Sequence, residues 1–208
     1  RRIIDRAATA ERELSTASSR IDRLQRDLEE ARNKALVDEL TGIANRRAAR
    51  TTIQDLETRK VRYCIAIIDV DHFKSINDVH GHQKGDEVLK AVAQALSAQL
   101  RGTDLLCRYG GEEFVVVVED SDVETALQLA DRARQAVSAR PVTLDDDRSV
   151  RLTVSVGVAM RKVAGSTASA LMGRADEALY EAKQAGRDLV RLARKGDGRL
   201  PPAMPVSA

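Results

Sequence analysis

This sequence has little cysteine, no long apolar run and no large excess of either charge. The two cysteines, Cys64 and Cys107, lie in separate apolar segments and form no C-x-x-C pair. We therefore expect two small reduced core residues in a cytoplasmic protein, not a disulfide framework. No apolar run approaches the roughly 18 residues of a membrane-spanning helix, so no membrane contact is expected from this segment.

The charge balance and the histidines exclude two further classes of site. The formal net charge is +2, which is too close to neutral to indicate binding to nucleic acid or to an anionic membrane. His80 and His82 could suggest zinc, but no further soft ligands accompany them. The sequence therefore indicates neither a nucleic-acid or membrane-binding protein nor a zinc site.

The N-terminal segment lacks glycine and proline as far as Asp38 and carries a heptad pattern. All ten of its core positions are apolar: Ile3, Ala7, Ala10, Leu14, Ala17, Ile21, Leu24, Leu28, Ala31 and Ala35. Such a repeat with charged intervening residues predicts a coiled coil of about 50 Å, formed with a second copy of the chain. Half of these positions are alanine, so we expect a thin and marginally stable contact. The alternative is one helix packed on its own domain.

A buried strand followed by a helix is predicted over 62–80. Residues 62–70 are mostly apolar and β-branched up to Asp69, as in a central strand that delivers Asp69 and Asp71 to the sheet edge. A helix begins near His72, and its first backbone N–H groups are free to face phosphate. A long amphipathic helix is expected after Asp86.

The segment 108–114 reads Arg-Tyr-Gly-Gly-Glu-Glu-Phe between two apolar runs. This pattern predicts a β-hairpin whose tight turn carries Glu112 and Glu113. Together with Asp69, these carboxylates suggest a two-metal site for phosphoryl transfer. Further along the chain, residues 121–124 resemble a helix-capping box opened by Ser121, and 150–160 alternates as a strand in which Gly157 marks a bulge or close approach.

These motifs resemble those of the GGDEF-domain diguanylate cyclases. The matching stretches are 38–47 (DELTGIANRR), 69–89 (DVDHFKSINDVHGHQKGDEVL), 101–114, 155–158 (SVGV) and 175–187 (ADEALYEAKQAGR). They occur in the family's order and spacing. The resemblance implies an α/β (α+β) fold in which a mixed central sheet is flanked by helices, similar to the palm of nucleotide cyclases and polymerases, after a long N-terminal helix.

The resemblance also implies roles for individual residues. Asp69 and Glu112, with the carbonyl of Val70, would ligate two Mg²⁺ or Mn²⁺ ions per site, and Glu113 would assist there or in activating a 3′-hydroxyl. Gly111 would let an α-phosphate lie against the backbone. The GTP contacts would come from these residues: Asn77 and Asp86 at guanine, and His72, Phe73, Lys74, Lys183 and Arg187 at the phosphates.

The implied reaction condenses two GTP into cyclic di-GMP and two pyrophosphates. One domain holds one GTP, so a homodimer is required, and the coiled coil would supply it. Arg101 and Asp104 match the family's RxxD product-inhibition motif, with Arg132 as a possible further contact for cyclic di-GMP. The implied location is the bacterial cytoplasm, although the longer protein expected around this segment could be membrane-associated and carry a sensor that is not visible here.

Several residues also have purely structural explanations. Asp86 suits the first turn of a helix, Lys183 and Arg187 suit a helix end beside Gly186, and Asp69 could cap a helix. Arg101 could equally be a helix C-terminal arginine beside a local acid. As whole-protein alternatives, a catalytically silent cyclic di-GMP receptor or a coiled-coil scaffold could carry this domain. The expected division is a coiled coil at 1–37, a catalytic domain at 38–193 and a disordered tail at 194–208.

Overall fold

The computed structural model describes residues 20–24, 27, 35–139, 141–143, 149–161 and 167–194. The chain divides into two compact units, Arg1–Val37 and Asp38–Ala208. In the first unit, residues 20–24 are helical. The rest of the heptad segment up to residue 34, apart from residue 27, lies outside the described residues, as does the predicted tail after Arg194.

The second unit is built on a six-stranded sheet in the order β1-β3-β4-β2-β7-β8. Its strands are β1 (Ala44–Asn45), β2 (Tyr63–Val70), β3 (Leu105–Arg108), β4 (Glu113–Glu119), β7 (Val154–Met160) and β8 (Val190–Leu192). The outer pairs β1·β3 and β7·β8 are parallel, and the inner pairs are antiparallel. The mixed sheet predicted from the sequence is therefore confirmed.

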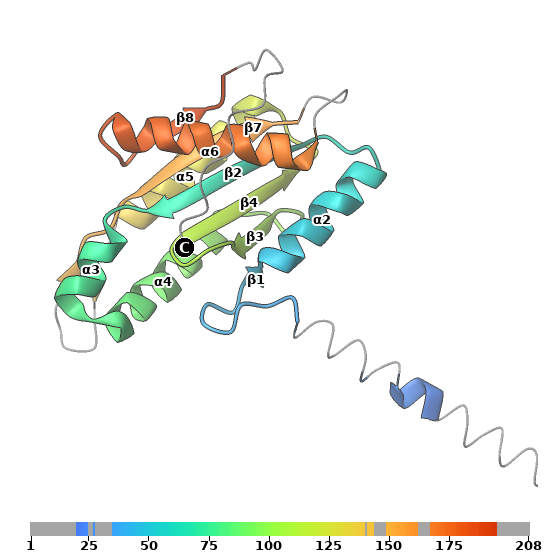
Figure 1. The fold of residues 1–208 in the computed structure, drawn as a ribbon, viewed down its shortest axis with the longest axis horizontal. Helices are drawn as coiled ribbons and strands as arrows, with labels where there is room; N and C mark the ends of the chain where they lie inside the picture. The colour runs from blue at the N-terminus through green and yellow to red at the C-terminus, as the bar shows by residue number, and fades with distance from the viewer. Residues whose placement is uncertain are drawn as a thin grey trace, which may run out of the picture. The chain divides into compact units, whose positions relative to one another are not determined.

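The central strand β2 is buried along all eight of its residues, because β4 and β7 pair with its two edges and helices cover both faces. Alternate residues point to opposite faces. Ile65 and Ile67 pack with α2 (Arg46–Thr58) and α6 (Ala168–Gln184). Ala66 and Ile68 pack with α3 (Phe73–His80), α4 (His82–Ser97) and α5 (Val123–Ser138). Figure 1 shows the helices in these two layers.

Two local predictions are corrected by the structure. The expected strand 150–160 is interrupted, because β6 (Ser149–Val150) pairs with β5 (Val142–Thr143) in a separate two-stranded sheet. The capping residue of α5 is Asp122 and not Ser121, since the Asp122 side chain accepts a hydrogen bond from the backbone N–H of Thr125 at 2.8 Å. Ser121 is instead buried.

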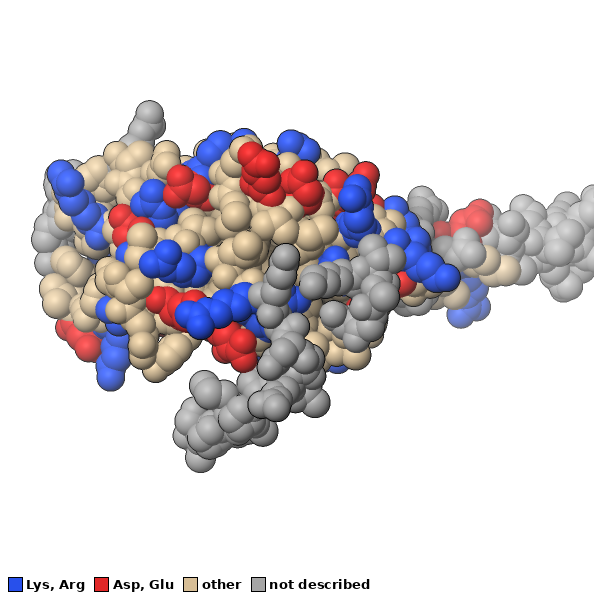
Figure 2. All heavy atoms as spheres, turned by 90° about the horizontal axis from the view of Figure 1, so that it is seen from above, with Lys and Arg blue, Asp and Glu red and all other residues tan. Residues whose placement is uncertain are grey.

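The remaining composition-based expectations concern the core and the surface. Cys64 and Cys107 are free and fully buried, and burial raises the pKa of Cys64 to about 11 and that of Cys107 to about 12. On the face shown in Figure 2, described acidic and basic side chains are interspersed. None of the described helices is long and apolar enough to cross a membrane.

Candidate active site

Asp69 and the two glutamates of the hairpin meet at the end of the central strand. Asp69 is the cross-strand partner of Glu113 in the antiparallel β2·β4 pair. One residue further on, the backbone N–H of Val70 donates to the carbonyl of Glu112 at 3.3 Å. The ladder register thus fixes Asp69, Glu112 and Glu113 as neighbours, although the first is more than forty positions away in the sequence.

A lysine from α6 reaches the same cluster. Lys183 Nζ lies 2.9 Å from Asp69 Oδ1 in an ion pair whose aspartate side chain is only 8% exposed. The approach of α6 depends on Gly157 of β7. A Cβ at Gly157 would collide with the Ala175 carbonyl and would lie 2.9 Å from Leu179 Cα. The predicted close approach at this glycine is therefore confirmed.

The surroundings of Asp69, Glu112 and Glu113 disfavour the ionised form of all three carboxylates. Burial, followed by the charges of neighbouring acids, raises the pKa of Glu112 and Glu113, whereas Lys183 partly offsets the effect. Burial also raises the pKa of Asp69, against the lowering influence of Lys183 and Arg187. Crowded carboxylates of this kind are relieved by a bound cation.

The Gly-Gly pair lies in the tight turn between β3 and β4. The N–H groups of Tyr109 and Gly110 both donate to the carbonyl of Glu113, at 2.8 and 3.3 Å. A Cβ at Gly110 would collide with the carboxylate of Glu113, whereas one at Gly111 would meet nothing within 4 Å. A methyl group at Gly110 would have to displace only the flexible end of the Glu113 side chain, so packing within the protein requires neither glycine, and the predicted need for Gly111 concerns an incoming nucleotide.

Arg108 also holds the hairpin turn in place through its side chain. The sequence motifs did not indicate this role. Its guanidinium donates to the carbonyl of Gly111 at 2.7 Å and pairs with Asp38 at 3.3 Å. Asp38 also accepts hydrogen bonds from the backbone and hydroxyl of Thr41. Burial alone would raise the pKa of Asp38, but these hydrogen bonds and the Arg108 charge lower it overall. Arg108 therefore connects Asp38, the first residue of the second unit, to the hairpin turn.

Helices α3 and α4 form a second part of the site. His72, at the N-cap of α3, has φ 58°, and no side chain caps the following N–H groups. Asn77 Oδ1 is buried and has no hydrogen-bond partner, and a Cβ on Gly85 would collide with it. Asp86 follows Gly85 and is exposed. The dipole explanation of Asp86 is wrong, because α4 begins at His82 and its first turn contains no acid.

Asp71 is only two residues from Asp69, but its carboxylate is occupied by hydrogen bonds from the protein. It is 5% exposed, and both of its carboxylate oxygens accept hydrogen bonds from the protein. Phe73 and Lys74 open α3 directly after it, with Phe73 buried and Lys74 exposed.

Arg101 and Asp104, the residues of the RxxD motif, lie just before β3. They are at the opposite end of this strand from the hairpin turn. Helix α4 ends at Ser97, so Arg101 is not the helix-terminal arginine that the structural alternative required. The N–H of Arg101 donates to Asp104 Oδ2 at 3.0 Å, and the N–H of Asp104 donates to the carbonyl of Arg101 at 3.0 Å. Arg132 of α5 donates to the carbonyl of Gln99 at 3.0 Å, which places it beside this loop.

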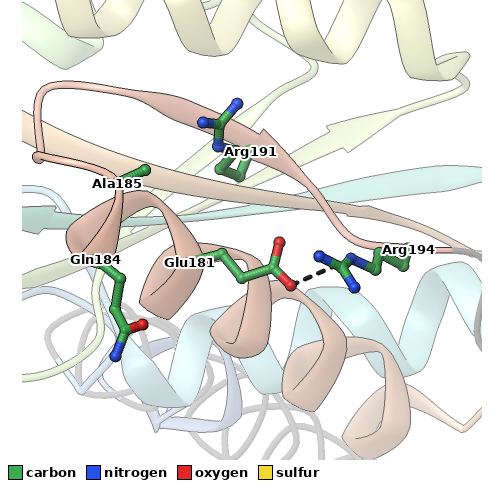
Figure 3. Close-up of a pocket in the computed structure, with 5 residues that line it drawn as sticks. All are labelled: Glu181, Gln184, Ala185, Arg191 and Arg194. Carbon is green, nitrogen blue, oxygen red and sulfur yellow. Dashed lines mark ion pairs between the residues drawn. The ribbon is translucent and has the colours of Figure 1, made fainter.

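Two surface hollows contain none of the predicted site residues. The one in Figure 3 lies along α6 and β8, where Glu181 pairs with Arg194 at 3.3 Å. The other lies between α4 and α5 and is lined largely by small apolar residues such as Ala95 and Ala136. As the described side chains stand, no group of three or more His, Cys, Asp or Glu could hold a metal ion. The metal ligands predicted from the sequence are the carboxylates of Asp69 and Glu112 and the backbone carbonyl of Val70, so only two of the three are side chains.

Comparison with known proteins agrees with this arrangement. The family model described as "Diguanylate cyclase, GGDEF domain" matches residues 35–189. The chain belongs to the GGDEF family. The response regulator PleD of Caulobacter vibrioides is 41% identical over 174 residues, which cover 81% of this chain and 38% of that protein. The diguanylate cyclase DgcP of Pseudomonas aeruginosa is 41% identical over 170 residues, which cover 80% of this chain and 25% of that protein.

Solved structures of the family share the fold of this GGDEF chain. The coiled coil and GGDEF domain of DgcB from Caulobacter crescentus, solved in complex with c-di-GMP, superposes with a TM-score of 0.80 at 33% identity. That comparison covers 88% of this chain and 98% of the other. The active GGEEF domain of a diguanylate cyclase from Vibrio cholerae gives a TM-score of 0.67 at 31% identity, covering 74% of this chain and 99% of the other. The present chain spans well under half the length of the two curated relatives described above.

Proposed function

We propose that this GGDEF domain is an active diguanylate cyclase that condenses two GTP into cyclic di-GMP. The observation that carries the proposal is the meeting of Asp69, Glu112 and Glu113 at one end of the sheet, with Lys183 brought against them by α6. A receptor that only binds cyclic di-GMP has no need for this arrangement. The related cyclases in the comparisons support the same reaction.

The donor chemistry of the cluster fits Mg²⁺ or Mn²⁺. Asp69 and Glu112 would supply carboxylate oxygens and Val70 a carbonyl oxygen, which are the hard ligands that these ions prefer. Such a set leaves coordination positions for phosphate oxygens and water. Bound divalent ions would neutralise charge that develops on the reacting phosphate. The raised pKa values of the carboxylates provide a further reason for the cluster to favour a cation.

The chain's own groups would hold GTP at both ends. Lys183 and Arg187 would bind the β- and γ-phosphates, together with the uncapped N–H groups of 72–74 at the start of α3. The buried Asn77 Oδ1 would accept a hydrogen bond from guanine. Asp86 would accept from the guanine N–H donors and so disfavour adenine.

The reacting centre would lie at the hairpin turn. Open space at Gly111 admits an α-phosphate close to the backbone. Glu113, whose carboxylate folds back over Gly110, would assist at the cation site or accept the proton of the 3′-hydroxyl. Two such domains must face each other, because each holds one GTP and each 3′-hydroxyl attacks the phosphate of the other nucleotide.

The N-terminal segment would bring the two domains together as a coiled coil. Its described core positions Ile21 and Leu24 are 55% and 59% exposed in the single chain, which leaves apolar surface for a partner helix. The DgcB structure that matches this chain also contains a coiled coil beside its GGDEF domain.

The cyclase assignment is tested by incubating the protein with GTP and Mg²⁺ and separating the nucleotides by chromatography. We expect cyclic di-GMP from the wild type and a loss of at least about 100-fold in Asp69→Asn, comparable with removing one preorganised electrostatic group. Glu124→Gln, on an exposed position of α5, serves as the control and should retain full activity. A wild type that binds cyclic di-GMP but forms none from GTP would establish the receptor instead.

Product inhibition through Arg101 and Asp104 is a separate proposal. The loop already holds both residues in one turn, with Arg132 nearby, and an arginine fork can bind phosphate and the Hoogsteen edge of guanine. We expect Arg101→Ala to keep its uninhibited rate while binding cyclic di-GMP about ten-fold more weakly, or about 1.4 kcal/mol. Initial rates at increasing cyclic di-GMP measure this. Equal inhibition of the wild type and Arg101→Ala by cyclic di-GMP would disprove this proposal.

A further inference from the structure

Asp71 is held by donors from two other segments of the chain. Its Oδ1 accepts from the Ser155 hydroxyl at 2.7 Å, and its Oδ2 accepts from the Thr153 hydroxyl at 2.7 Å. The third donor is the backbone N–H of Asp188, at 3.1 Å from Oδ2. Asp71 therefore joins the end of β2 to β7 and to the turn that follows α6.

That turn has an unusual backbone. Gly186 has φ 116°, and the next two residues, Arg187 and Asp188, have φ 64° and 48°. The left-handed region costs an ordinary residue about 1–2 kcal/mol, and aspartate tolerates it better than arginine because its short side chain bonds locally. Arg187 in this conformation must therefore be held by its surroundings, a situation found most often at functional sites.

Three contacts hold the turn in place. The N–H of Arg187 donates to the carbonyl of Ala182 at 3.1 Å and ends α6 in a Schellman-type cap. The N–H of Asp188 bonds to Asp71, as described above. The carboxylate of Asp188 pairs with Arg134 of α5 at 2.7 Å, and the arginine side chain is only 19% exposed. The turn is thus clamped between β2 on one side and α5 on the other.

We propose that Asp71, Asp188 and Arg134 form a bridge that positions Arg187, and the end of α6 that carries Lys183, to bind the β- and γ-phosphates of GTP. The inference rests on the proposed function of this site. Asp71 and Asp188 are positioning residues, because their carboxylates are occupied by the protein's own donors. Arg134 contributes from a helix on the opposite face of the sheet, so α5 takes part in shaping the phosphate site.

The bridge is tested with Asp188→Asn and Arg134→Gln. Asparagine keeps the backbone N–H that bonds to Asp71 and tolerates the left-handed conformation, so the first change removes only the charge pair. Asp120→Asn is the matched control. Asp120 also has a positive φ, of 43°, and pairs with an arginine, Arg62, at 3.2 Å, but it lies in the turn after β4. Asp71→Asn tests the other contact of the bridge, the hydrogen bond from the Asp188 N–H to the Asp71 carboxylate.

The decisive readout compares two non-reacting probes in the presence of Mg²⁺. 3′-Deoxy-GTP carries the whole triphosphate but lacks the attacking hydroxyl, whereas GMP lacks the β- and γ-phosphates. We expect Asp188→Asn, Arg134→Gln and Asp71→Asn to bind 3′-deoxy-GTP about ten-fold more weakly and to bind GMP as the wild type does. In turnover, the KM for GTP should rise more than kcat falls.

Three outcomes would overturn the inference. The first is unchanged 3′-deoxy-GTP affinity in the variants. The second is an equal loss for both probes, which indicates general damage to the fold. The third is a matching loss in Asp120→Asn. A wild type that binds neither probe and makes no cyclic di-GMP would remove the proposed function, and the bridge's role with it, whereas failure of the bridge alone leaves the wild-type activity intact.

Discussion

Glu113 shows how neighbours that are distant in sequence set the chemistry of one side chain. Burial first, and then the charges of Asp69 and Asp176, raise its pKa, while Lys183 and Arg46 act in the opposite direction. Because its folded-state pKa is raised, Glu113 contributes stability that is present below its ordinary pKa of about 4.3 and is lost as the pH rises through the folded-state pKa.

This sign gives a prediction for the metal-free protein. In EDTA, Glu113→Gln should be more stable than the wild type at pH 7, and the difference should vanish near pH 3.5, below the ordinary glutamate pKa of about 4.3. Urea denaturation at several pH values measures it. A stability difference between Glu113→Gln and the wild type that is independent of pH would contradict the argument.

At the hairpin, the sequence predicted the turn but not the contacts around its two glycines. The Gly-Gly pair correctly indicated a turn, because that information is local. The sequence did not show that a Cβ at Gly110 would meet the Glu113 carboxylate, whereas the space around Gly111 is open. The Arg108 contacts with Asp38 and Gly111 were also missed, since one partner lies seventy positions away.

Among the elements, α6 carries the basic half of the candidate site. Its buried face includes Leu171, Ala175 and Leu179, which recur at helical spacing. How close it lies to the sheet is decided by Gly157, where a Cβ would meet the helix backbone. Backbone atoms cannot rotate away as a side chain can, so the helix itself would have to move.

We therefore expect Gly157→Ala to lower the free energy of unfolding by about 1–3 kcal/mol, as overpacking does, and to raise the KM for GTP by displacing Lys183. Gly173→Ala is the matched control. It lies inside α6, where an added methyl group would meet nothing within 4 Å, and it should stabilise the helix by about 0.5–1 kcal/mol. Thermal denaturation and steady-state kinetics report both effects. A Gly157→Ala protein that is as stable and active as the wild type would disprove the packing argument.

At the scale of the whole molecule, the proposed reaction needs two copies of the domain in one geometry. The heptad pattern predicts that a coiled coil supplies it, and the core residues are evenly divided between alanine and larger side chains. Residue 37 is the last of the first unit, and Asp38 pairs with Arg108 at the hairpin. Residues 35–38 form a turn and a bridge instead of continuing a helix, so we expect a change of helical phase in the coil to reach the hairpin turn through this segment.

Insertions of one to four alanines immediately before Ala35, inside the heptad repeat, should change the rate according to helical phase, since each residue rotates a helix by about 100°. The largest losses are expected for one and two residues. A seven-residue insertion, which restores the heptad repeat, serves as the control and should recover activity. Cyclic di-GMP formation at fixed protein concentration measures this series. Equal rates for every insertion would show that the coil's phase is irrelevant.

The sequence by itself determined the central strand, the helix after it, the hairpin and the identity of the chemical groups, because hydrophobic period, turn residues and motif spacing are local properties. Tertiary structure alone decided which groups meet. The register of β2 against β4 brings Asp69 beside Glu113, and the packing of α6 on Gly157 brings Lys183 to Asp69. The hydrogen bonds of Asp71 likewise join three segments. Such contacts depend on side-chain packing between distant segments, which no local pattern encodes.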